Sequence, residues 1–362
     1  MSYQDVDFGM HRVDPLRMIR FGLANDAFLT EAGAAFTDRF LQRLIDGAAA
    51  VEAAFEADPT LANERIDAPI FVIGPPRTGT TALHRLLAAH PHHRVPQGWE
   101  FLYPTSADEP AVIEAAAAEL GWPQAQQAEI RAIHTYDARM PKECLSAMSF
   151  AFRSEEFISR YRLPAYTNYL TACDMQPAYD VHRRVLQLLQ RRVPTRRWVL
   201  KSPVHLQSIP ELVATYPDAS FAVTHRDPAR VLGSVSSLVV ALRRAFSDSV
   251  DPVEIGHYHL ELYARSLDAL VDHVEGVLPA ERTVHVRHLD LVRDPVGTVS
   301  TVYDRLGIDV TDDITDRARD AAAAEREDGV GAHRYELADY GLDADEIAER
   351  FARYADRFLG EG

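Results

Sequence analysis

The chain has 362 residues, of which 47% are hydrophobic and 25% are charged, and its formal net charge is -16. This composition is typical of a soluble globular protein, and the acidic excess disfavours nucleic-acid binding, which needs a basic surface. Cys144 and Cys173 could pair, but two thiols in a chain of this length are more typical of core residues than of a disulfide scaffold. The amino terminus lacks a long apolar segment, and no run approaches the roughly 18 apolar residues of a membrane span. We therefore expect a cytoplasmic protein without an integral membrane segment.

The sequence pattern predicts helices at both ends of the chain and in a long middle segment. Residues 1–66 carry apolar side chains at spacings that suit a helical extension packed on a core. Residues 107–197 predict a helical insertion rich in aromatic residues, most of them expected in the core and some beside a bound ligand. Residues 311–362 predict a turn-rich loop and a closing amphipathic helix. Together with an α/β core, formed by 67–106 and 198–310, these segments are expected to make a single domain.

The predicted core begins with a strand, a glycine-containing loop and a helix. Ile70–Ile73 is a run of β-branched and aromatic residues that favours a buried strand. Gly74 and Gly79 bracket the loop, and Thr80 opens a helix; this geometry aims free backbone N–H groups and a helix dipole at a phosphate. The spacing resembles a nucleotide-binding P-loop, but Thr80 stands where that loop has its lysine, and Arg77 is the only cation within the loop. An ordinary strand-to-helix turn is the alternative.

Three further strands alternate with helices along the core. They are Trp198–Leu200, Phe221–Thr224 and Thr283–Val286. Such alternation predicts a parallel sheet with ligands at the carboxyl ends of its strands. Residues 95–104 predict another strand or extended segment. The expected fold is therefore an α/β, P-loop-like three-layer sandwich with a central parallel sheet.

Cationic and hydroxyl side chains follow three of these strands. The groups are Arg77 with Thr78, Thr80 and Thr81; Lys201 with Ser202; and Arg226 with Ser234. Any one of them could be a solvated surface group. Three groups at successive strand ends favour one anion-binding pocket at the edge of the sheet.

The segments PPRTGTT, LKSPVH and YPDASFAVTHRDPARVLGSVSSL carry a resemblance to a known family. They resemble the 3′-phosphoadenylyl sulfate (PAPS)-dependent sulfotransferases, most closely the bacterial branch related to tyrosylprotein sulfotransferases. The likeness extends from about Ile70 to Leu238 and again through HRYELADYGL. In that family a PRSGTT-like loop binds the 5′-phosphosulfate, and an arginine and a serine eight residues later bind the 3′-phosphate. Arg226 and Ser234 stand at that separation.

The resemblance implies transfer of a sulfuryl group from PAPS to a hydroxyl of a small molecule, lipid or glycan, without a metal. Such a reaction should resemble phosphoryl transfer, in which catalysis is mostly positioning and electrostatic stabilisation. Arg77 and Lys201 suit the bridging and leaving-group oxygens. Cytosolic members close over the nucleotide with a loop that is absent here, and GVGAHRYEL is its expected replacement. The residues expected to bind PAPS are Arg77, Thr78, Gly79, Thr80, Thr81, Arg226, Ser234, Arg334 and Tyr335.

The attacking hydroxyl must lose a proton, and two residues are candidate general bases. Glu100 lies between Trp99 and Phe101, at a distance from the loop comparable to that of a glutamate in the tyrosylprotein group. His205 lies two positions beyond the place at which cytosolic sulfotransferases have a catalytic histidine, and Pro203 occupies that place. A surface glutamate and a helix-capping histidine are the competing interpretations.

Two other functions remain open at this point. A kinase or NTPase with the same fold is disfavoured because the P-loop lysine and a convincing Mg²⁺ carboxylate are missing. A non-catalytic nucleotide-binding protein would keep the pocket without turnover. The aromatic insertion suggests an apolar or ring-bearing acceptor, and the sequence carries no signal for the oligomeric state.

Overall fold

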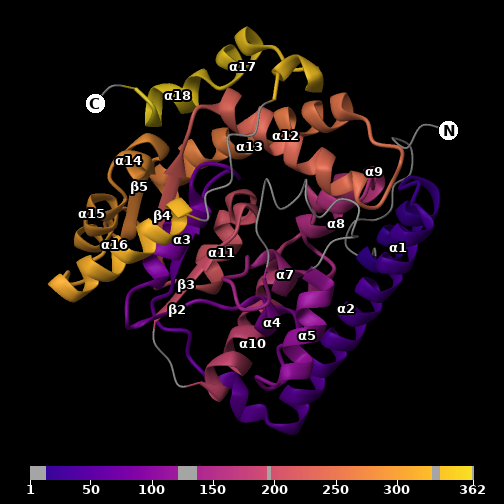
Figure 1. Ribbon diagram of the computed structural model, residues 1–362, viewed down its shortest axis with the longest axis horizontal. Coiled ribbons are helices and arrows are strands. Elements are labelled where there is room, and N and C mark those ends of the chain that lie inside the picture. Colours follow the sequence, from indigo (N-terminus) through magenta and orange to yellow (C-terminus); the bar gives the residue numbers. More distant parts are fainter. Residues whose placement is uncertain (1–13, 121–136, 194–196, 328–334, 361–362) are drawn as a thin grey trace.

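The computed structural model describes residues 14–120, 137–193, 197–327 and 335–360 (Figure 1). Its centre is a parallel sheet in the order β2-β3-β1-β4-β5. The strands are β1 (Ile70–Ile73), β2 (His93–Arg94), β3 (Arg197–Lys201), β4 (Ser220–His225) and β5 (Thr283–Arg287). The strands predicted at Ile70–Ile73, Trp198–Leu200, Phe221–Thr224 and Thr283–Val286 are present as β1, β3, β4 and β5. The short β2 adds an edge strand that the sequence did not indicate.

Side chains of the central strands alternate between the two faces of the sheet and bury both. Ile70 and Val72 pack with one group of helices, whereas Phe71 and Ile73 pack with the other. The first group is α3 (Thr80–Ala88), α15 (Pro295–Arg305) and α16 (Asp312–Glu327). The second group is α10 (Gln176–Arg192), α11 (Ile209–Thr215), α12 (Pro228–Arg244) and α13 (Pro252–Gly276). The predicted three-layer sandwich is confirmed.

The helical extension and the helical insertion continue the second layer away from the sheet (Figure 1). The extension comprises α1 (Pro15–Asn25), α2 (Glu31–Ala57) and the 3₁₀ turn η3 (Pro59–Asn63). The insertion contains α5 (Pro110–Leu120), α7 (Leu145–Met148), η5 (Ser149–Ala151), α8 (Glu155–Arg160), α9 (Pro164–Leu170) and α10. Phe40 of α2 and Tyr166 of α9 belong to the same buried cluster as Phe71 of the sheet. Most aromatics of the insertion are therefore core residues, as expected.

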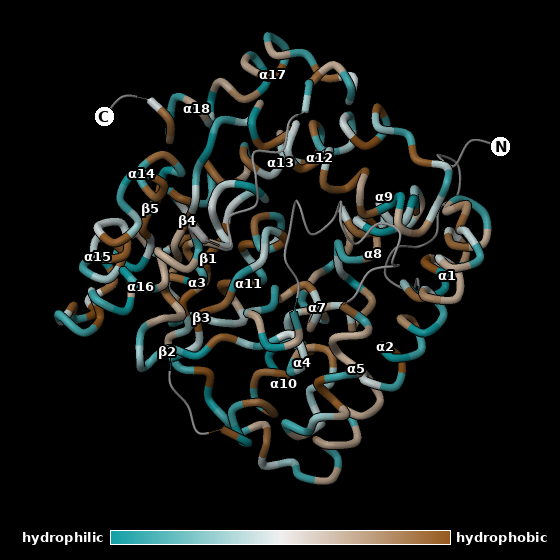
Figure 2. Tube along the Cα trace, viewed as in Figure 1, coloured by the Kyte–Doolittle hydropathy of each residue, from teal (hydrophilic) through white to brown (hydrophobic). Residues whose placement is uncertain are grey.

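The remaining elements connect or close the sandwich. They are α4 (Gly98–Leu102), η6 (Pro203–Gln207), η7 (Ala280–Arg282), α14 (His288–Arg293), η8 (Leu337–Tyr340), α17 (Ala344–Arg350) and α18 (Ala352–Phe358). Hydrophobic and hydrophilic residues alternate along many of the outer helices (Figure 2). Cys144 and Cys173 are both free thiols. Within the described ranges, no helix is long and apolar enough to cross a bilayer.

The strand or extended segment predicted at residues 95–104 is instead interrupted by the helix α4 at Gly98–Leu102. Gln97 and Glu100 explain this: the backbone N–H of Gln97 donates to the Glu100 carboxylate at 2.9 Å, and the Gln97 side chain completes a capping box. Reciprocal capping satisfies N–H groups that a helix start otherwise leaves unpaired. The aromatic residues that suggested a strand are buried by this short helix instead.

We expect Leu83→Ala to destabilise the fold strongly. Leu83 of α3 is fully buried under the sheet, so truncation removes apolar contacts and leaves a cavity. The free energy of unfolding should fall by about 2–5 kcal/mol in urea melts. Leu289→Ala is the matched control, because Leu289 is 75% exposed and its truncation should cost less than about 0.5 kcal/mol. Equal losses in the two variants would contradict the packing of α3 described above.

Candidate functional site

The loop between β1 and α3 depends on residues with left-handed backbone geometry. Gly74 has a φ of 143° and Gly79 a φ of 92°, and a side chain at Gly74 would overlap the hydroxyl of Thr224. Arg77 also adopts a positive φ, 68°, which is uncommon for a residue with a side chain. These turns bring the chain back over the end of β1 and start α3 at Thr80. The amino end of α3 is thereby directed toward the carboxyl edge of the sheet.

Thr78 fastens this loop to the neighbouring strand β4. Its side chain is fully buried, its hydroxyl donates to the carbonyl of Pro75 at 2.7 Å, and it also pairs with the Thr224 hydroxyl. The side chain of Thr78 is therefore directed into the protein and positions the loop, so that a ligand could meet only its backbone.

Two of the three predicted cations are connected through the loop itself. The Arg77 side chain donates to the Ser234 hydroxyl at 3.0 Å, and the Arg226 guanidinium donates to the Arg77 carbonyl at 2.6 Å. Arg77 and Arg226 both line one cavity of about 340 Å³. The structure thus brings Arg77, in the loop after β1, together with Arg226 and Ser234, which lie about 150 residues later in the chain.

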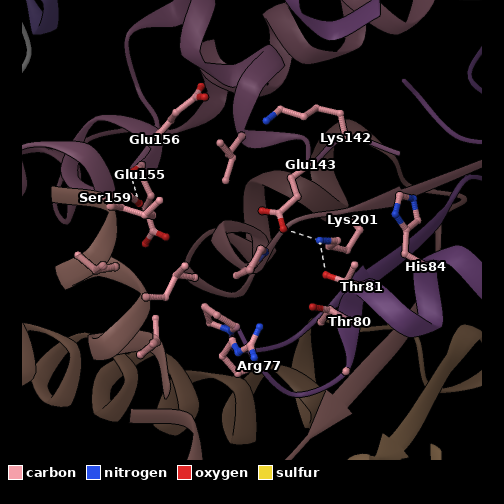
Figure 3. Close-up of a pocket in the computed structure, with 18 of the residues that line it drawn as sticks. Arg77, Thr80, Thr81, His84, Lys142, Glu143, Glu155, Glu156, Ser159 and Lys201 are labelled. Atoms are coloured by element: carbon pink, nitrogen blue, oxygen red, sulfur yellow. Dashed lines mark hydrogen bonds and ion pairs between the residues drawn. The ribbon is translucent and has the colours of Figure 1, made fainter. Parts of the chain in front are cut away.

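Lys201, the third cation, enters the same cavity from the end of β3. It is almost completely buried, and its ammonium donates to the Thr81 hydroxyl at 3.1 Å and forms an ion pair with Glu143. Figure 3 shows Glu143 pointing across the cavity to Lys201, with Thr81 and Thr80 beneath the pair. The Glu143 side chain keeps 23% of its surface exposed. A carboxylate and an ammonium therefore face the space next to the phosphate-type loop.

Glu143 and His288 are cavity residues that the sequence analysis did not identify. Glu143 lies in the insertion outside any motif, beside Lys142, and only the fold places it against β3. His288 opens α14 after β5, and burial together with the nearby Arg226 lowers the pKa of its imidazole. Its ring packs close to Gly79. A neutral imidazole therefore stands beside the two arginines.

Away from the sheet edge, many side chains that line the cavity are apolar, although Glu155, Glu156 and Arg160 of α8 also line it. The apolar side chains come from α7, α8, α12 and α13. They include Leu145, Ile158, Val235, Leu238, Val239, Leu242, Leu262 and Tyr263. The cavity thus combines a cationic floor at the sheet edge with a hydrophobic wall beyond it, which is the arrangement expected of a site for a small organic ligand.

The two predicted bases lie away from this cavity. Glu100 forms an ion pair with Arg94 at 2.6 Å and accepts the N–H of Gln97, so its carboxylate is already used inside the protein. His205 is fully buried, with its ring edge-on to Phe71 and its Nδ1 2.9 Å from the Tyr179 hydroxyl. Burial holds the pKa of His205 well below its usual range. Neither residue lines the cavity, and their geometry supports structural roles.

Tyr335 lies beside the predicted phosphate-binding end of α12. Its hydroxyl donates to the Arg230 carbonyl at 3.0 Å, and its ring covers Gly233, next to Ser234. Arg334 lies outside the described residues. Within the described residues, no group of three or more His, Cys, Asp or Glu side chains could hold a metal ion.

The fold and the cavity together define an α/β protein with a phosphate-type loop in which arginine and threonine stand instead of lysine. Residues 69–312 match the model of the sulfotransferase family, and the chain belongs to this family. A curated relative, omega-hydroxy-beta-dihydromenaquinone-9 sulfotransferase Stf3 of Mycobacterium bovis, is 29% identical over 259 residues. That alignment covers 67% of this chain and 63% of the relative's length.

Two solved structures are similar over nearly the whole chain. Sulfotransferase STF1 of Mycobacterium tuberculosis has 30% identity and a TM-score of 0.78, covering 94% of this chain and 91% of its own. Sulfotransferase STF9 of Mycobacterium avium has 25% identity and a TM-score of 0.81, covering 97% and 93%. The resemblance stated from the sequence motifs is confirmed at the level of the family.

We expect Thr78→Val to destabilise the loop, because valine fills nearly the same volume as threonine but lacks the hydroxyl. The substitution leaves the Pro75 carbonyl and the Thr224 hydroxyl short of a partner in a buried place. The free energy of unfolding should fall by about 1–3 kcal/mol, measured by thermal or urea denaturation. Thr301→Val is the matched control, because the exposed Thr301 hydroxyl only bonds within its own helix. A loss no larger than that of the control would argue against Thr78 as the fastening of the loop.

Proposed function

We propose that this chain transfers the sulfuryl group of PAPS to a hydroxyl of a small-molecule or lipid acceptor by in-line displacement. Membership of the sulfotransferase family supports the reaction class. The observation that carries the proposal is the convergence of Arg77, Lys201 and Arg226 on one cavity beside a lysine-free loop. Such a site offers cations for two phosphate groups of one nucleotide.

The loop and the start of α3 suit the 5′-phosphosulfate end of the donor. The backbone N–H groups near Gly79, Thr80 and Thr81 supply hydrogen bonds without adding a mobile side chain. Arg226 and Ser234 suit the 3′-phosphate, and both already contact Arg77. Tyr335 on the adjoining face of α12 suits the nucleoside end of the donor. The donor would therefore lie along the carboxyl edge of β1 and β4.

Charge stabilisation is assigned to Lys201 and Arg77. As the acceptor oxygen forms its bond to sulfur, the bond between sulfur and the bridging oxygen breaks, and that oxygen keeps the electron pair. Buried cations aimed at this oxygen stabilise charge that is largest in the transition state, which raises the rate. Lys201 is well suited because its ammonium is held at the loop by Thr81.

Glu143 is the proposed general base in place of Glu100 and His205. Its carboxylate lines the cavity, and Lys201 is one of its partners. When Lys201 turns toward the leaving oxygen, the Glu143 carboxylate loses this ion pair and can accept the acceptor's hydroxyl proton. The proton then resides on Glu143 and the negative charge on the departing phosphate.

An acceptor with an apolar body suits the wall formed by α12 and α13. The name of the relative Stf3 gives a hydroxylated menaquinone, which combines a hydroxyl with a hydrophobic molecule. We extend that class, a hydroxyl on an apolar skeleton, to this chain. The donor is the same for every acceptor of the class.

We expect Arg226→Ala to weaken the binding of adenosine 3′,5′-bisphosphate by about 10- to 100-fold. Loss of charge-assisted hydrogen bonds to the 3′-phosphate is the reason. Isothermal titration calorimetry measures the change. Arg230→Ala, at an exposed position four residues later in the first turn of α12, should bind as the parent does. Binding of Mg-ATP in preference to the bisphosphate would contradict the proposed donor.

We expect Glu143→Gln to lower kcat by about 10²–10⁴-fold because the base is removed. The affinity for adenosine 3′,5′-bisphosphate should not fall, because Lys201 no longer has to leave a carboxylate to meet the nucleotide. A panel of phenols and alcohols with labelled PAPS, read by mass spectrometry, gives the rates. Glu325→Gln is the control, since Glu325 also lines the cavity but pairs with Arg85.

The same assay tests the alternative bases. Glu100→Gln should reduce stability, because it disrupts the pair with Arg94, and leave the kcat of the folded enzyme within a few-fold. If Glu143→Gln retains full kcat while Glu100→Gln loses it, the base assignment fails.

A further inference from the structure

A second cavity of about 320 Å³ adjoins the first on the side away from the sheet-edge cations. Its walls come from α8, α9, α11, α13 and η6. They include Leu170, Cys173, Met175, Val204, Leu206, Gln207, Glu211 and Ala269. Glu155 and Leu262 line both cavities, so these two side chains form part of the wall between them.

Glu155 completes this wall through a hydrogen bond. The Gln207 side-chain amide, from η6, donates to the Glu155 carboxylate at the start of α8. The bond therefore joins α8 to η6 at the wall between the two cavities. Figure 3 shows Glu155 on the side of the first cavity opposite Lys201 and His84, with Ser159 next to it.

Helix capping does not require this carboxylate. The Ser154 hydroxyl already caps α8 by accepting the N–H of Glu156. The neighbouring Glu156 has an ion pair with Arg160 at 2.6 Å, whereas the Glu155 carboxylate accepts a hydrogen bond from the neutral Gln207. A neutral amide thus helps to hold Glu155 in the wall between the two cavities.

The electrostatics of Glu155 suit an apolar neighbour. Burial raises the pKa of Glu155 to about 7, and the Glu143 carboxylate acts in the same direction, while the Gln207 bond lowers it. A substantial fraction of Glu155 is therefore protonated near neutrality. A neutral carboxyl group is much less costly than a carboxylate beside a hydrocarbon chain.

We propose that the Glu155–Gln207 hydrogen bond is a gate that sets the length of acceptor the enzyme takes. The acceptor's hydroxyl would lie near Glu143, its apolar body along α12 and α13, and its far end against Glu155. The inference rests on the proposed function for the direction in which the acceptor lies. Opening the gate joins the two cavities and admits a longer hydrophobic alcohol.

A series of 4-alkylphenols, from propyl to decyl, tests this gate by binding. The enzyme is loaded with adenosine 3′,5′-bisphosphate, and each phenol is titrated by calorimetry. With the parent enzyme, affinity should rise with chain length and then stop rising. With Glu155→Ala the rise should continue, on the order of tenfold for every two further methylene groups buried.

Two further variants separate the gate from a general loss of structure. Glu155→Gln keeps the bulk and a hydrogen-bonding end, so it should keep the parent's length limit. Glu211→Ala removes a carboxylate that lines only the second cavity, and it should also keep that limit. Thermal melts establish that all three variants are folded.

The proposal is overturned if affinity stops rising at the same chain length in Glu155→Ala as in the parent, or if it never stops rising in the parent. It is also overturned if no phenol binds. Failure of the proposed function gives a different result. In that case, no phenol would be sulfated from PAPS, while the length limit and its release by Glu155→Ala would still be seen in binding.

Discussion

The attachment of the β1–α3 loop to β4 is the contact on which the rest of the site depends. Thr78 and Thr224 meet beneath the loop, and Gly74 lets the two backbones approach closely enough for them to do so. With the loop fixed, the Arg77 carbonyl is in place to accept Arg226, and the Arg77 side chain reaches Ser234. Buried neutral hydrogen bonds thus set the position of the half-buried Arg77 and Arg226.

The parallel sheet explains how such distant residues meet. Strands β3, β1 and β4 are neighbours, and each ends at the same edge, so the residue after each strand faces the same space. Lys201 and Arg226 flank the loop from opposite sides for this reason. The insertion then supplies Glu143 and Glu155, and α12 and α13 supply the apolar wall. Cations come from the ends of strands or the loops after them, whereas the groups that contact the acceptor in our proposal come from the insertion and from α12 and α13.

This division explains what the sequence could and could not predict. Ile70–Ile73 and its glycine loop are local patterns, and Lys201 and Arg226 follow strands, so their meeting follows from topology alone. Glu143 carries no local signature, because its contact with Lys201 depends on how the insertion packs on β3. Glu100 matched a spacing in related proteins, yet its capping box and Arg94 turned it inward. His205 likewise lies inside the protein, since η6 directs its ring into the aromatic core around Phe71.

The Lys201–Glu143 pair gives the proposed reaction an order. Without the donor, each charge neutralises the other in a largely buried place, where an unpaired charge would be costly. An anionic donor at the loop competes for Lys201, and every hydrogen bond that Lys201 gives to it is withdrawn from Glu143. The Glu143 carboxylate therefore loses its ion pair with Lys201, and becomes more available as a base, only when the donor is bound. In the proposed mechanism, the acceptor would therefore lose its proton only when a bound sulfuryl group is present for its oxygen to attack.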